Sequence, residues 1–200
     1  MKKNNSRSSE TLLQLAHNKK LSGDLTYQRI LETLGERAFG IVILFFALPS
    51  ALPLSAVPGV SFLFSVPIAI FATQMIILRN TLWLPKILAQ RTIHRDTMVK
   101  FIHKSVPYLV KAEYFLKPRW AFATSRFMES ILGVIILFLS LLLMLPIPFS
   151  NFFLSLLLII FSLGLIEKDG LMIMIGYVGT VLYVGLISML ILAFVRRIFI

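Results

Sequence analysis

Residues 130–166 read SILGVIILFLSLLLMLPIPFSNFFLSLLLIIFSLGLI, and this stretch contains no Asp, Glu, Lys or Arg. Residues 38–78 and 171–195 are free of charge in the same way. A charged side chain at the centre of a bilayer costs roughly 2.5–3.5 kcal/mol, so long charge-free runs are typical of segments surrounded by lipid. The composition agrees, since 58% of the 200 residues are hydrophobic and 14% are charged. The sequence therefore predicts an all-α integral membrane protein.

Prolines interrupt both of the longer apolar stretches near the middle. Residues 49–59 read PSALPLSAVPG and residues 145–151 read LPIPFSN. Proline cannot continue a helix without losing a backbone hydrogen bond and clashing with the preceding turn. We therefore expect two helical hairpins, residues 38–78 and 130–166, whose tips either reach the far membrane surface or stop inside the bilayer as re-entrant loops.

The third apolar stretch, residues 171–195, predicts a C-terminal transmembrane helix followed by Arg196 and Arg197. Either this helix crosses once and places both arginines on the far side, or it bends near residues 176–179 and returns.

The two hairpins align without a gap at an offset of 93 residues. This alignment places Gly40 on Gly133, Pro53 on Pro146 and Gln74 on Glu167. We interpret the shared helix–break–helix plan as an internal structural repeat. Paired broken helices in corresponding halves are typical of transporters that bind a substrate between the repeats.

Positive charge is confined to two zones. Of the 20 Lys and Arg residues, only Lys168, Arg196 and Arg197 lie outside residues 1–37 and 79–126. The positive-inside rule places both zones in the cytoplasm. We expect amphipathic helices there, including residues 25–34 and a longer basic helix after residue 96, lying on anionic headgroups. In so apolar a chain, the net charge of +11 indicates anionic lipid rather than nucleic acid as the partner.

These boundaries divide the chain into five parts: an N-terminal amphipathic segment (1–37), hairpin 1 (38–78), a basic interfacial region (79–129), hairpin 2 (130–166), and an acidic turn with the C-terminal helix (167–200). No enzyme activity, cofactor or metal is predicted. The chain has no cysteine, and we find no phosphate-binding loop or catalytic spacing.

Several pieces of this sequence, in this order and spacing, resemble the ExoD family of exopolysaccharide-synthesis membrane proteins. They are residues 34–40 (LGERAFG), 47–54 (ALPSALPL) with 58–59 (PG), 83–85 (WLP), 145–151 (LPIPFSN) and 167–170 (EKDG). The chain departs from the family pattern at Ala38 and Ser150, where glycine is usual, and at Lys168, where arginine is usual. The resemblance covers residues 31–190 and implies a role in bacterial surface-polysaccharide production and, in some members, tolerance of alkaline conditions.

Polar residues at the membrane boundaries and helix breaks are the candidate site residues, and each has a structural alternative. Glu36 and Arg37 either gate a cavity or anchor the helix end at the headgroups. Glu167 and Asp169 either relay protons or form a polar turn in which Asp169 caps the next helix. Gln74 and Asn151 either line a site or make one interhelical hydrogen bond. The full set of candidates is Glu36, Arg37, Pro53, Pro58, Gly59, Gln74, Arg79, Pro146, Pro148, Asn151, Glu167 and Asp169.

The leading functional hypothesis is a multi-pass protein of the bacterial inner membrane that handles a lipid-linked or anionic substrate for polysaccharide synthesis. A polyprenyl-phosphate lipid is one candidate, with its phosphate near Asn151 and Arg37 or Arg79 as the counter-charge. One alternative is a cation or proton transporter that titrates Glu36, Glu167 and Asp169. Another is a scaffold that docks an enzyme through its basic region. Assembly as a homo-oligomer is also expected.

Overall fold

The computed structural model describes residues 25–26, 31, 34–52, 60–79, 81–83, 92–93, 116–120, 122–145 and 150–199. Within these ranges the protein is helical, as predicted. Its helices are α3 (Arg37–Ala51), α4 (Val60–Ile76), α7 (Arg126–Met144), α8 (Ser150–Glu167) and α9 (Gly170–Phe199).

Two short strands, β1 (Leu25–Thr26) and β2 (Thr92–Ile93), pair antiparallel. The sequence had predicted the start of an amphipathic helix at residue 25, and that prediction is wrong for these two residues. The long basic helix predicted after residue 96 lies outside the described residues.

Both predicted hairpins contain two helices separated by the proline-rich break. In hairpin 1, α3 ends at Ala51 and α4 begins at Val60; in hairpin 2, α7 ends at Met144 and α8 begins at Ser150. Residues 53–59 and 146–149, with the candidates Pro53, Pro58, Gly59, Pro146 and Pro148, lie outside the described residues.

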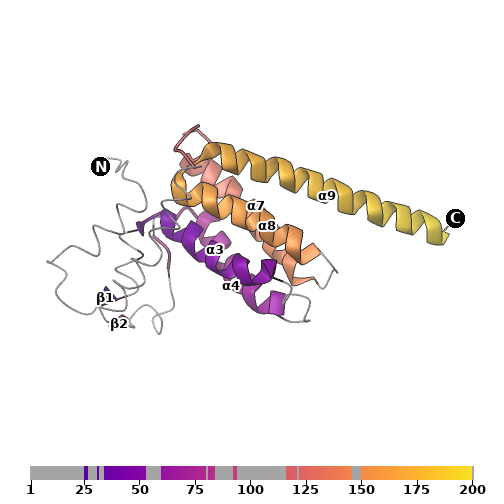
Figure 1. Ribbon diagram of the computed structural model, residues 1–200, viewed down its shortest axis with the longest axis horizontal. Helices are drawn as coiled ribbons and strands as arrows, with labels where there is room; N and C mark the ends of the chain where they lie inside the picture. The colour runs from indigo at the N-terminus through magenta and orange to yellow at the C-terminus, as the bar shows by residue number, and fades with distance from the viewer. Residues whose placement is uncertain are drawn as a thin grey trace.

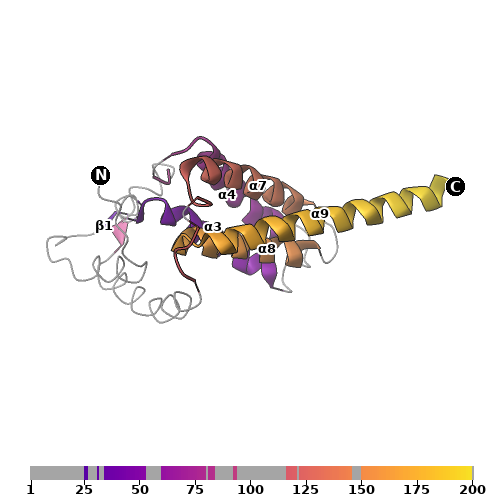
Figure 2. The same ribbon diagram turned by 90° about the horizontal axis from the view of Figure 1, so that it is seen from above.

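The two hairpins interlock instead of lying side by side as separate units. The first helix of each hairpin packs most extensively on the second helix of the other, so that α3 lies against α8 and α4 lies against α7 (Figure 2). The side chains between them are fully buried, including Ile43 on α3 and its counterpart Ile136 on α7. Large apolar side chains also cover the outside of the bundle, as expected for a surface that faces lipid.

Glycine permits the closest contacts between the hairpins. A Cβ atom on Gly40 would lie 2.8 Å from the backbone oxygen of Ser162, and a Cβ atom on Gly133 would lie 3.1 Å from that of Ala72. Gly133 follows Gly40 by 93 positions, whereas Ser162 follows Ala72 by 90.

The ends of α4 and α8 match at the same offset of 90. In α4, Arg79 N–H donates to the Gln74 carbonyl (3.2 Å) across Leu78, which has a φ of +56°. In α8, Asp169 N–H donates to the Gly164 carbonyl (2.9 Å) across Lys168, which has a φ of +53°. Both ends are Schellman-type closures built on a non-glycine left-handed residue.

These matches correct the gapless alignment made from the sequence. An offset of 93 fits α3 with α7, but 90 fits α4 with α8, because the break between α7 and α8 is three residues shorter than that between α3 and α4 (residues 145–149 against 52–59). At the offset of 90, Gln74 aligns with Gly164 and not with Glu167, and the carbonyls of Gln74 and Gly164 accept the matching hydrogen bonds.

Three of these helices, α7, α8 and the Gly170–Arg197 part of α9, are long and apolar enough to cross a membrane. The other two are shorter: the 15 residues of α3 span about 22 Å and the 17 of α4 about 25 Å, compared with about 30 Å of hydrocarbon.

The C-terminal helix α9 is unbroken over 30 residues, or about 45 Å, and extends well beyond the bundle (Figure 1). The alternative in which this segment bends near residues 176–179 and returns is therefore wrong. Gly176 and Gly179 instead let α9 approach α8, since a Cβ on them would meet the Phe161 ring and Leu157.

We expect Gly40→Ala and Gly133→Ala each to lower the free energy of unfolding by about 1–3 kcal/mol, because the added methyl group overpacks a helix contact with little room to shift. Gly185→Ala is the matched control, since its Cβ would meet nothing within 4 Å. Unfolding in detergent micelles measures all three. Equal stability of the three variants would contradict the close packing.

Candidate functional site at the charged end of the bundle

Charged side chains gather where α3 and α7 begin and where α4 and α8 end. Glu36 precedes α3, and its carboxylate accepts a 2.6 Å ion-pair hydrogen bond from Lys168, which follows α8. Glu129 lies in the first turn of α7, in the neighbourhood of Glu36, Lys168 and Arg126. We call this group of residues, together with Arg79, the charged end.

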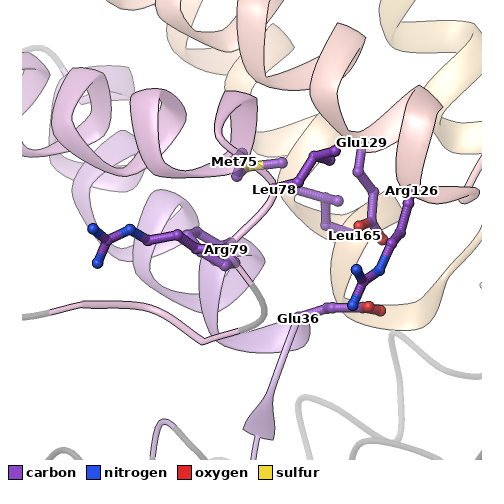
Figure 3. A pocket seen from close by; sticks show the side chains of 8 residues that line it. Glu36, Met75, Leu78, Arg79, Arg126, Glu129 and Leu165 are labelled. Carbon is purple, nitrogen blue, oxygen red and sulfur yellow. The ribbon is translucent and has the colours of Figure 1, made fainter.

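A small cavity opens at the charged end. Its accessible volume of about 20 Å³ has room for roughly one water molecule. Arg126 points toward Glu36 with the Glu129 carboxyl beside it, whereas Arg79 points away (Figure 3). The lining residues are Glu36, Phe39, Met75, Leu78, Arg79, Arg126, Glu129 and Leu165.

Asp169, which directly precedes α9, is fully buried and is held by structural bonds. Its carboxylate accepts 3.0 Å hydrogen bonds from the backbone N–H groups of Leu171 and Lys117, and Arg119 Nε lies 3.5 Å away. The bond to Leu171 satisfies a free N–H at the start of α9. The predicted capping role of Asp169 is therefore confirmed, and its carboxylate also anchors residues 117–119.

Two further candidates lie at this end. Arg37 is the first residue of α3, and Glu167 is the last residue of α8 and is buried. Both have interaction partners within the structure. The structure thus brings Glu36, Arg37, Arg79, Glu167 and Asp169 to the same end of the bundle.

Gln74 is a structural residue. It is buried in α4, and its side-chain amide pairs with the backbone of Trp83: Trp83 N–H donates to Oε1 (2.8 Å) and Nε2 donates to the Trp83 carbonyl (3.2 Å). This pairing replaces the interhelical hydrogen bond that the sequence had suggested. It holds the chain after α4 against the bundle and leaves the Trp83 ring exposed, as in an interfacial anchor.

Asn151 lies at the opposite end of the bundle, where α4 and α8 begin. Its Nδ2 donates to Ser61 Oγ at 2.8 Å, which joins the first turns of these two helices. Ser61 and Asn151 differ by 90 positions, so they are counterparts in the two hairpins. The neighbouring Ser150 hydroxyl bonds the hydroxyl of Tyr183 on α9.

Sequence reasoning missed Glu129, Arg126 and Lys168 as members of the charged end. A signal for Glu129 was present, because the offset of 93 that joins Gly40 to Gly133 also places Glu36 on Glu129. No spacing in the sequence indicates that Lys168 reaches Glu36, since 132 positions separate them.

Comparison with known proteins assigns this architecture to a family. The profile described as "Exopolysaccharide synthesis, ExoD" matches residues 8–189. The chain belongs to the ExoD family. It is 32% identical to the protein named ExoD from Rhizobium meliloti over 171 residues, which are 82% of this chain and 70% of that protein. It is 33% identical to an uncharacterised protein of Synechocystis over 155 residues, 77% of this chain and 73% of the relative. No solved structure matches.

We expect the Asp169→Ala variant of this ExoD family member to lose stability. Loss of the cap costs about 1 kcal/mol, and the unsatisfied backbone N–H of Lys117 adds roughly 1–3 kcal/mol. The segment at residues 117–119 should also detach, which limited trypsin digestion after Arg119 measures. Asp169→Asn, which keeps an acceptor for Leu171, should lose less. Wild-type protease resistance of Asp169→Ala would contradict the anchoring role.

Proposed function

We propose that this protein is a multi-pass component of the bacterial inner membrane that handles a lipid-linked or otherwise anionic substrate during exopolysaccharide synthesis. Family membership supports the process, and the three long apolar helices support the membrane location. Most of the Lys and Arg residues belong to residues 1–37 and 79–126 of the sequence, which the positive-inside rule favours on the cytoplasmic side.

We also propose that the hairpins are an internal repeat with a two-fold axis along the bundle. Exchanging the hairpins turns the α3–α8 contact into the α7–α4 contact, and it exchanges Gly40 with Gly133. The hydrogen bond between Asn151 and Ser61 joins two exchanged positions, so it lies near the proposed axis. Transporters with parallel repeats bind their substrates at such interfaces.

The observation that carries the substrate proposal is this contact between Asn151 and Ser61. It brings the N-terminal ends of α4 and α8 together, and each helix N-terminus carries a partial positive charge. Two such ends aimed at one place favour an anion such as a lipid phosphate. The opening turns also carry the buried hydroxyl of Ser150 as a polar group.

Helix lengths support hairpin tips that end within or just at the far edge of the bilayer. The 18 residues of α8 extend about 27 Å from the charged end, whereas α9 starts at the same end and continues for about 45 Å. The substrate's anionic group would then meet the hairpin tips close to the far surface while its lipid chain remains in the bilayer.

The cation-transport alternative has less support in its original form. Of its three proposed titrating groups, Glu36 is paired with Lys168 and Asp169 caps α9. Both carboxylates therefore have structural partners that an exchanging group would have to release.

We expect Asn151→Asp to abolish complementation of an exopolysaccharide-deficient strain lacking this protein while its membrane abundance stays normal. A carboxylate is tolerated in the first turn of a helix, but it repels an anionic substrate from the paired helix ends. Arg37, which the sequence suggested as the counter-charge, begins α3 at the charged end and so lies at the opposite end of the bundle from this site. Ser65→Ala is the control, because Ser65 bonds only its own helix, to the carbonyl of Phe62. Full complementation by Asn151→Asp would refute the substrate site.

A further inference from the structure

The charged end has two halves, one formed by α3 and α8 and the other by α7 and α4. The residues at matching positions of the two halves differ. Glu36 and Glu129 are counterparts at the start of α3 and α7, and Lys168 and Leu78 are counterparts after α8 and α4. Lys168 and Leu78 share the same left-handed backbone conformation, with φ values of +53° and +56°. Their side chains therefore leave the two helix ends in equivalent ways.

In one half, Lys168 forms an ion pair with Glu36. In the other half, the apolar side chain of Leu78 takes the position that corresponds to Lys168. Lys168 Nζ is 2.6 Å from Glu36 Oε2, which stabilises Glu36 as a carboxylate. At the counterpart position, Leu78 lines the cavity together with Glu129. The two glutamates thus share one small space but have different surroundings.

The charged groups around Glu129 come from every element that packs there. They are Glu36 before α3, Arg79 after α4, Arg126 on α7 and Lys168 after α8. The negative charge of Glu36 opposes a negative charge on Glu129, because two neighbouring carboxylates resist being ionised together. Arg126 passes beside the Glu129 carboxyl and points toward Glu36 (Figure 3). Lys168 is bonded to Glu36.

The size and charge of the cavity restrict its ligand. About 20 Å³ accommodates roughly one water molecule, which is too little for a phosphate or a sugar. A metal ion would meet the guanidinium of Arg126 beside Glu129, and the described part of the chain contains no group of three metal-ligating side chains. A proton on a carboxyl, exchanged through a single water, satisfies both limits.

We propose that Glu129 is a proton-binding site reached through the water-sized cavity, and that Glu36, which is bonded to Lys168, is its ion-paired counterpart. Ionisable groups within membrane-spanning segments serve as proton relays in transporters. This site goes beyond the proposed function at the hairpin tips and does not depend on it, because it lies at the other end of the bundle.

Dicyclohexylcarbodiimide tests the proposal without an activity assay, because it reacts with the protonated form of a carboxyl in an apolar environment. The acid adds across the carbodiimide and rearranges to a stable N-acylurea that retains all atoms of both reactants. We expect peptide mass spectrometry of the treated full-length protein in micelles to find the adduct on Glu129 and not on Glu36. Labelling should fall as pH rises, and Glu129→Gln should lose it.

Exchanging the counterpart residues provides matched variants. Leu78→Lys gives Glu129 the partner that Glu36 has, so labelling of Glu129 should be lost, whereas the neutral control Leu78→Met should keep it. Lys168→Leu removes the partner of Glu36, so Glu36 should become labelled. Equal labelling of Glu36 and Glu129 in the wild type, or no labelling of Glu129, would overturn the proposal.

The outcome is separable from that of the substrate site. If Asn151→Asp complements fully but Glu129 is labelled, the substrate proposal fails and the proton site stands. If Asn151→Asp is inactive and Glu129 is not labelled, the substrate proposal stands and the proton site fails.

Discussion

The close approach of each hairpin to the other is the constraint on which the bundle depends. At Gly40 and at Gly133 the backbones of two helices come so near that a single methyl group would have to displace its neighbours. Without a hydrophobic driving force between helices in lipid, such contact between small residues is a main source of association. Because the contacts join α3 to α8 and α4 to α7, neither hairpin buries its own inner face alone.

This interlocking also determines where the charges meet. It brings the starts of α3 and α7 beside the ends of α4 and α8, so Glu36, Glu129 and Lys168 converge although they are far apart in sequence. At the opposite end it brings Asn151 to Ser61. One arrangement of helices thus produces two polar regions of different character, a cluster of ionisable side chains and a pair of helix N-termini.

The sequence predicted the arrangement of helices better than it predicted the residues of the candidate site. Charge-free runs and prolines predicted both hairpins and the C-terminal helix, because avoidance of charge and breaks in helices are local properties of the chain. The role of Gln74 was not accessible, since nothing in the sequence indicates that its amide faces the backbone of Trp83. The ion pair of Lys168 with Glu36 depends on how the hairpins interlock, and that follows from packing rather than from pattern.

The proposed topology requires the charged end and the C-terminus to lie on opposite sides of the membrane. The chain has no cysteine, so Lys117→Cys at the charged end and Arg197→Cys near the end of α9 each provide one labelling site. In intact spheroplasts, a membrane-impermeant maleimide should label Arg197→Cys, and it should label Lys117→Cys only after permeabilisation. Labelling of both positions from the same side would contradict this topology.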